Sequence, residues 1–168
     1  MKPKKAAFLG LMVALAMILS YVESLIPVFA AVPGVKLGLT NVVVLTALVG
    51  INGKYAFLIN VIRIILVGFT FGNLFSMVYS LAGGMLSFLV MILLWKTKKF
   101  SPVGVSVAGG VAHNAGQIIA AIFILETGKL IYYLPVLCIS GVVSGVIVGL
   151  LGGAVVSRLS AGGMFRDL

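Results

Sequence analysis

The sequence GVVSGVIVGLLGG, residues 141–153, places a glycine at every fourth position: Gly141, Gly145, Gly149 and Gly153. Residues four apart lie on the same face of an α-helix, so this spacing predicts a helix with one smooth face. Apolar residues fill most of the other positions. In a membrane, faces of small residues let two helix backbones approach closely. The stretch therefore predicts a transmembrane helix that packs tightly against a neighbour.

The composition extends this conclusion to the whole chain. Hydrophobic residues make up 62% of the 168 residues and charged residues 9%, whereas soluble domains carry about 25% charged residues. Because one crossing takes about 20 apolar residues, the length allows about six or seven crossings. We expect a single transmembrane domain, residues 1–168, in contact with the lipid bilayer of the cell membrane.

Charge and helix-breaking residues divide the chain into six apolar segments. These segments are residues 6–26, 37–50, 55–67, 74–95, 103–125 and 131–157. With the N-terminus in the cytoplasm, nine Lys and Arg residues fall inside, and two, Lys36 and Lys129, fall outside. The positive-inside rule therefore predicts six transmembrane helices with both termini cytoplasmic, in an all-α, polytopic fold. The scattered cations account for the net charge of +9, and we expect no nucleic-acid partner.

Several polar residues lie within these apolar segments, where ionisable groups are costly and mark candidate functional sites. Arg63 and His113 both fall roughly 14 Å from the inner end of their helices, by helical rise. Asn60 shares a face with Arg63, as Gln117 does with His113, while Asn114 points about 100° away. Arg63, Asn60, His113 and Gln117 are candidates for an inner binding pocket, and Asn114 is a further candidate for substrate binding. For His113, an interhelical hydrogen bond and direct ligand contact both remain open.

A second polar set lies near the outer face. It includes Glu23 late in the first segment and Lys36 and Asn41 near the start of the second. These residues are candidates for the mouth of the pocket. The intervening sequence PVFAAVPGVK, residues 27–36, is apolar and contains two prolines. It is either a lid over the pocket or a plain connector.

Catalytic and energy-coupling motifs are missing from the sequence. Prenyl transferases hold magnesium and diphosphate with aspartate-rich motifs, but the one aspartate here is Asp167. There is no Walker A motif for ATP and no Ser-His-Asp or HExxH set. The single cysteine, Cys138, and single histidine offer no metal-ligand cluster. We therefore expect no enzymatic activity, no catalytic residue, no metal and no cofactor.

Three stretches carry a family resemblance: GVKLGLTNVVVLTALVG (34–50), VIRIILVGFTFG (61–72) and VAHNAGQ (111–117). Together they resemble the heptaprenyl diphosphate synthase component I family, also called the Gx transporter family. This family is in turn similar to the substrate-binding, or S, components of energy-coupling factor (ECF) transporters. The resemblance implies six helices, a vitamin-like small-molecule substrate, and partners in the form of a transmembrane coupling subunit and separate ATPases.

In S components the first helix docks the coupling subunit through small residues. Ala6, Gly10 and Ala14 occupy that place here, with Gly10 departing from an alanine-only motif. From the residues alone, this stripe is either a docking face or ordinary internal packing. The resemblance leads us to expect a substrate-binding component of an importer. The alternative is a non-catalytic membrane accessory of prenyl-quinone synthesis or of flavin- or quinone-linked electron transfer.

Overall fold

The computed structural model describes residues 3–25 and 38–165, which form six α-helices and one short 3-10 helix with no strand among them. The helices are α1 (Pro3–Leu25), α2 (Thr40–Gly50), α3 (Gly53–Thr70), α4 (Leu74–Lys96), α5 (Pro102–Leu125), η1 (Gly128–Tyr133) and α6 (Leu134–Ala161). In this part of the chain five helical spans are long and apolar enough to cross a membrane, the last being η1 and α6 together. The all-α, multi-pass membrane architecture expected from the sequence is therefore confirmed, while α2, with 11 residues, is shorter than a crossing helix.

Helix boundaries differ from the predicted segments where local capping decides them. The third helix begins at Gly53, not at residue 55, because the Asn52 side chain accepts a hydrogen bond from Tyr55 N at 3.2 Å. It also continues to Thr70, so it is long enough to span a membrane. The sixth predicted segment begins instead as η1, and Pro135 lies in the first turn of α6. Proline favours this position because its missing N–H would have no helical partner there.

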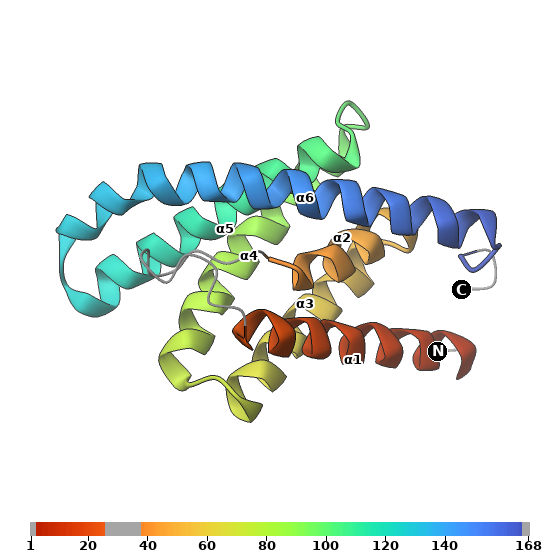
Figure 1. Ribbon diagram of the computed structural model, residues 1–168, viewed down its shortest axis with the longest axis horizontal. Helices are drawn as coiled ribbons and strands as arrows, with labels where there is room; N and C mark the ends of the chain where they lie inside the picture. Colours follow the sequence, from red (N-terminus) through yellow and green to blue (C-terminus); the bar gives the residue numbers. More distant parts are fainter. Residues whose placement is uncertain (1–2, 26–37, 166–168) are drawn as a thin grey trace.

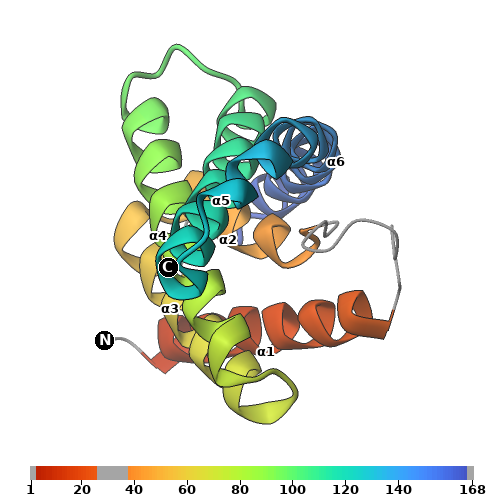
Figure 2. The ribbon, with the colours of Figure 1, turned by 90° about the vertical axis from the view of Figure 1, so that its left-hand side faces the viewer.

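The short helix α2 lies at the centre of the bundle. Every residue from Val43 to Leu48 is buried, and α2 packs against α1, α3, α5 and α6. In two perpendicular views α1 and α6 lie on opposite sides of α2 (Figure 1, Figure 2). A helix that is apolar on all faces is stable only when it is surrounded. The neighbours of α2 therefore place its polar N-terminus, at Thr40 and Asn41, inside the protein.

The α5–α6 and α4–α5 contacts are the most extensive in the fold, and glycines make them possible. A Cβ added at Gly145 would lie 2.6 Å from Val107 Cα, and one at Gly149 would lie 2.6 Å from Val103 Cα. A Cβ at Gly116 of α5 would lie 2.8 Å from the carbonyl oxygen of Ala82 on α4. The glycine spacing of residues 141–153 thus gives the close helix approach that it predicted.

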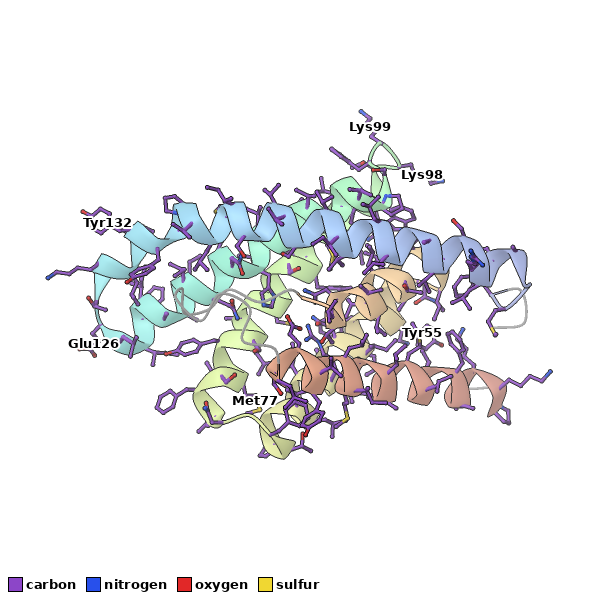
Figure 3. The ribbon with its side chains drawn as sticks, viewed as in Figure 1. Tyr55, Met77, Lys98, Lys99, Glu126 and Tyr132 are labelled. Carbon is purple, nitrogen blue, oxygen red and sulfur yellow. The ribbon has the colours of Figure 1, made fainter. Side chains whose placement is uncertain are left out.

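Different parts of the chain lie at the two ends of the bundle. The start of α1 and the end of α6 lie at the same end of the molecule (Figure 1). Lys98 and Lys99 lie nearer that end, whereas Glu126 and Tyr132 lie at the other (Figure 3). Between the ends the surface exposes large apolar side chains, among them Leu11, Ile139 and Leu150. An apolar outer surface of this kind is suited to lipid contact.

Candidate functional site

Arg63 is the centre of a hydrogen-bond network that joins α2, α3 and α4. Its guanidinium donates to Asn41 Oδ1 at 3.1 Å and to Asn60 Oδ1 at 3.0 Å. Asn60 is 2% exposed, and its Nδ2 donates to the carbonyl oxygen of Gly84 at 3.1 Å. The structure therefore brings together three of the residues that the sequence selected. Buried polar groups of this kind are stable only when they are hydrogen-bonded.

The end of α1 is tied to the same region. Glu23 Oε1 accepts a hydrogen bond from Gly38 N at 2.5 Å, and the Ser20 and Thr40 hydroxyl oxygens lie 2.7 Å apart. The negative charge of Glu23 also acts on Arg63. A cation at membrane depth is stabilised by such an opposite charge and by its hydrogen-bond acceptors. Glu23 thus attracts Arg63 electrostatically and also accepts a hydrogen bond from the chain just before α2.

A narrow pocket opens beside this network. Its lining comes from the residues before and at the start of α2 and from α4, α5 and α6: Gly38, Asn41, Ser87, Met91, Ser106, Gly109, Gly110, Ser144, Gly145 and Val148. The space is about 280 Å³ when it is counted out to its open mouth, and its interior has room for about one water molecule. Asn41, one of the predicted binding residues, lines it, and Arg63 is connected to it through Asn41.

Serine side chains contribute polar groups to the lining of this pocket. Ser87 and Ser106 are each 4% exposed, and neither hydroxyl makes a hydrogen bond to another residue in the described ranges. Ser144, by contrast, donates to the carbonyl oxygen of Gly141 on its own helix at 3.3 Å. The two buried hydroxyls of α4 and α5 are therefore available to a molecule in the pocket.

The predicted residues of α5 lie against α4 and α6. At Gly83 of α4, an added Cβ would lie 2.7 Å from the His113 carbonyl oxygen and 2.8 Å from Gln117 Cγ. At the neighbouring Gly84, an added Cβ would lie 3.2 Å from Asn60 Nδ2. Asn60 and His113 therefore lie beside two consecutive residues of α4, Gly84 and Gly83.

Asn114 points elsewhere. It is 9% exposed, and its Nδ2 donates to the Leu137 carbonyl oxygen of α6 at 2.6 Å. Asn114 is one of the predicted substrate-binding residues. This bond gives its side chain an interhelical contact between α5 and α6, and its part in binding stays a prediction. Lys36, the remaining candidate for the mouth of the pocket, lies outside the described residues, as do residues 27–36 of the proposed lid.

The small-residue stripe of α1 lies on an open surface. Ala6, Gly10 and Ala14 are all exposed, and a Cβ added at Gly10 would meet no heavy atom within 4 Å. The opposite face of α1, with Leu9, Met12 and Ala16, is buried. Within the described residues, the stripe is therefore not used for internal packing.

Sequence reasoning missed the pocket serines because their signal is weak. Serine within a transmembrane helix often bonds to the carbonyl of its own preceding turn, as Ser157 does to Gly153. The sequence alone does not distinguish such a serine from Ser87 or Ser106. Only the close approach of α4, α5 and α6 brings these serines to the lining of one pocket.

Comparison with known proteins identifies a family. The model of the family described as heptaprenyl diphosphate synthase component I matches residues 12–155, which is most of the chain. Neither the comparison with curated proteins nor the comparison with solved structures gives a match. The matched region includes α2 to α5 and the residues that line the pocket. The chain belongs to the heptaprenyl diphosphate synthase component I family.

Proposed function

We propose that this protein is the substrate-binding membrane component of a small-molecule importer, energised by a separate coupling subunit and ATPases. The observation that carries the proposal is the polar pocket at Asn41, Ser87 and Ser106, enclosed by apolar helices and backed by Arg63. Polar groups are expensive within a membrane and are retained chiefly where they bind, transport or pack. A pocket with available hydroxyls and an adjacent cation supports the binding of a polar solute.

The open stripe of α1 supports the partner half of the proposal. Ala6, Gly10 and Ala14 form a smooth face on which another helix can approach closely. The word "component" in the family description also implies partner subunits. In this proposal the protein itself is not an enzyme and binds its substrate without changing it.

Purification of the protein in mild detergent from its native membrane tests this function. Native mass spectrometry is expected to show a retained small molecule, and the co-purified proteins are expected to include a membrane subunit and ATPases. A matched preparation of Ser106→Leu, which fills the pocket, is expected to lose the small molecule. Retention of the same molecule by Ser106→Leu would contradict binding in this pocket.

The family description favours a second function: a non-catalytic membrane accessory of heptaprenyl diphosphate synthesis. The same purification separates the two, because an accessory would co-purify with a soluble prenyl synthase and not with ATPases. A retained molecule that partitions into organic solvent would favour this second function, since a prenylated ligand is largely hydrocarbon.

The proposed orientation places both termini in the cytoplasm. In a Cys138→Ala background, a single cysteine at position 98 is expected to react with a membrane-impermeant thiol reagent from the inside. A cysteine at position 129 is expected to react from the outside, because Lys98 lies just before α5 and Lys129 just after it, in η1. Outside labelling at position 98 would reverse the orientation that the positive-inside rule predicts.

A further inference from the structure

We propose that the pocket binds a hydrogen-bond acceptor, a carbonyl or carboxylate group, through Asn41 Nδ2, and that Arg63 orients Asn41 for this task. The inference rests on the proposed function, because it names the ligand class of the same pocket. It assigns Asn41 and the serine hydroxyls to ligand contact and makes Arg63 a positioning residue.

The orientation of the Asn41 carboxamide follows from its partner. Arg63 NH2 donates to Asn41 Oδ1 at 3.1 Å, and a guanidinium has no acceptor atom. The amide oxygen must therefore face Arg63, and the amide nitrogen must face away. A flipped carboxamide would set two donors against each other, so the hydrogen-bond network alone fixes the assignment of oxygen and nitrogen.

The amide nitrogen points toward the pocket. A Cβ added at Gly38, a lining residue, would lie 3.3 Å from Asn41 Nδ2. Across the described residues, this nitrogen donates no hydrogen bond. A hydrogen-bond donor that lines a pocket and has no partner among the described residues favours a ligand that carries a hydrogen-bond acceptor.

The surrounding groups agree with an acceptor ligand. The Ser87 and Ser106 hydroxyls are buried, make no hydrogen bond to described residues, and line the same pocket. A hydroxyl can donate as well as accept, so all three groups can donate to one carbonyl or carboxylate. No acidic side chain is among the lining residues of this pocket. Among the described lining residues, a cationic ligand would therefore find no carboxylate to pair with.

The narrow interior limits what enters. With room for about one water molecule, the pocket admits a small acceptor group and not a bulky ring, unless the helices move. The remainder of the ligand would lie toward the open mouth. The acceptor group can belong to a water-soluble solute or to a lipid headgroup, since both carry carbonyl oxygens.

Formate and methylammonium are suitable probes, because formate accepts hydrogen bonds and methylammonium only donates them. Each salt replaces sodium chloride at constant ionic strength, and the thermal midpoint of the purified protein is measured in detergent. Formate is expected to raise the midpoint and methylammonium to leave it unchanged, since a ligand that binds the folded state stabilises it.

Asn41→Asp replaces the hydrogen-bond donor in the pocket by an acceptor and preserves the contact with Arg63. A carboxylate oxygen replaces the amide nitrogen, so formate binding is expected to weaken by at least about tenfold, the value of one hydrogen bond to a charged group. Methylammonium is expected to become the stabilising ion. The control, Asn73→Asp, adds the same charge at the N-cap of α4, where Asn73 accepts from Ser76 N at 2.8 Å. It is expected to keep the wild-type response.

Two more variants separate the roles of individual residues. Ser106→Ala removes a pocket hydroxyl without touching Arg63 and is expected to weaken the formate response. Arg63→Met releases the Asn41 carboxamide, which can then turn, so the preference for formate over methylammonium is expected to fall. A purely structural Arg63 would instead lower the midpoint equally in all three salts.

The outcomes are decisive for the inference. An unchanged formate response in Asn41→Asp, or no response to either ion in the wild type, would overturn it. If wild type and Asn41→Asp retain the same co-purified molecule, the inference fails and the proposed function stands. If formate binding depends on Asn41 but no molecule is retained or transported, the inference stands and the proposed function fails. Extraction of the retained molecule into water or organic solvent distinguishes a solute from a lipid.

Discussion

Two stripes of small residues, one on α6 and one on α1, have the same pattern in the sequence and opposite surroundings in the structure. Gly141, Gly145 and Gly149 are buried against the backbone of α5. Gly10, in the stripe of α1, meets no heavy atom within 4 Å of an added Cβ. Small residues at every fourth position therefore predict that another helix approaches closely, but they do not predict which helix it is. For α6 the partner is in the chain, and for α1 we propose a separate subunit.

Substitution by a larger residue should destabilise the protein most in the α6 stripe. Gly145→Leu places a side chain where a Cβ alone would lie 2.6 Å from Val107 Cα and 2.9 Å from the Ser106 carbonyl oxygen. Because backbone atoms cannot move aside, we expect a loss of at least about 3 kcal/mol in stability. Thermal unfolding in detergent and size-exclusion chromatography measure it.

Gly153→Ala is the matched control on the same helix, since its nearest neighbour, Pro102 Cβ, would lie 4.0 Å from the new methyl group. It should behave like the wild type. If Gly145→Leu is as stable as this control, α5 and α6 do not pack as described.

The α4–α5 contact extends the comparison to a third glycine. Gly83→Ala adds a methyl group 2.7 Å from the His113 carbonyl oxygen and 2.8 Å from Gln117 Cγ. Overpacking of this size costs about 1–3 kcal/mol, and the thermal midpoint should fall accordingly. Gly104→Ala is the control, because its new methyl group would lie 3.7 Å from the nearest atom, Phe100 Cδ1. Equal midpoints for the two variants would show that the α4–α5 contact is looser.

A polar contact supplements the glycines between α5 and α6. Asn114→Leu removes the hydrogen bond to the Leu137 carbonyl oxygen, and interhelical bonds of this kind contribute roughly 0.6–2 kcal/mol. We expect a loss of stability in that range, measured by thermal unfolding without ligand. Unchanged stability of Asn114→Leu, together with loss of the retained molecule, would return Asn114 to the binding residues.

The α1 stripe should show the smallest effect on the isolated protein. Gly10→Leu meets open space, so its unfolding free energy should stay within about 0.5 kcal/mol of wild type, as for ordinary surface substitutions. Co-purification with the coupling subunit should nevertheless be lost, because a large side chain keeps the helices apart.

Leu11→Ala, at an exposed neighbour of Gly10, is the control for Gly10→Leu and should keep the partner. Destabilisation of the isolated protein by Gly10→Leu would mean that the stripe packs internally and would remove the contrast with α6.

Local features of the sequence determined much of this protein. Apolar composition and segment length predicted an all-helical membrane protein, because backbone polar groups in a bilayer must be satisfied within the helix. Asparagine or serine before the helices marks where α3, α4 and α5 begin, at Asn52, Asn73 and Ser101. The cost of polar groups in a membrane singled out Asn60 and Arg63, and the polar set near the outer face included Asn41. The structure joins these three residues in one network.

Tertiary structure decided what depends on two or more helices at once. Spacing along one helix places residues on a face. Whether the space beside a glycine is occupied by a neighbouring helix, as at Gly145, or is empty, as at Gly10, depends on the tertiary structure. The pocket also needs several helices, because α2, α4, α5 and α6 each contribute one polar side chain, and the serines among them have no signal of their own. Asn114, which the sequence selected as a binding residue, donates a hydrogen bond to α6, a contact that depends on the neighbours of the side chain in space. Sequence periodicity is a property of one helix, whereas a binding site is a property of the contacts between helices.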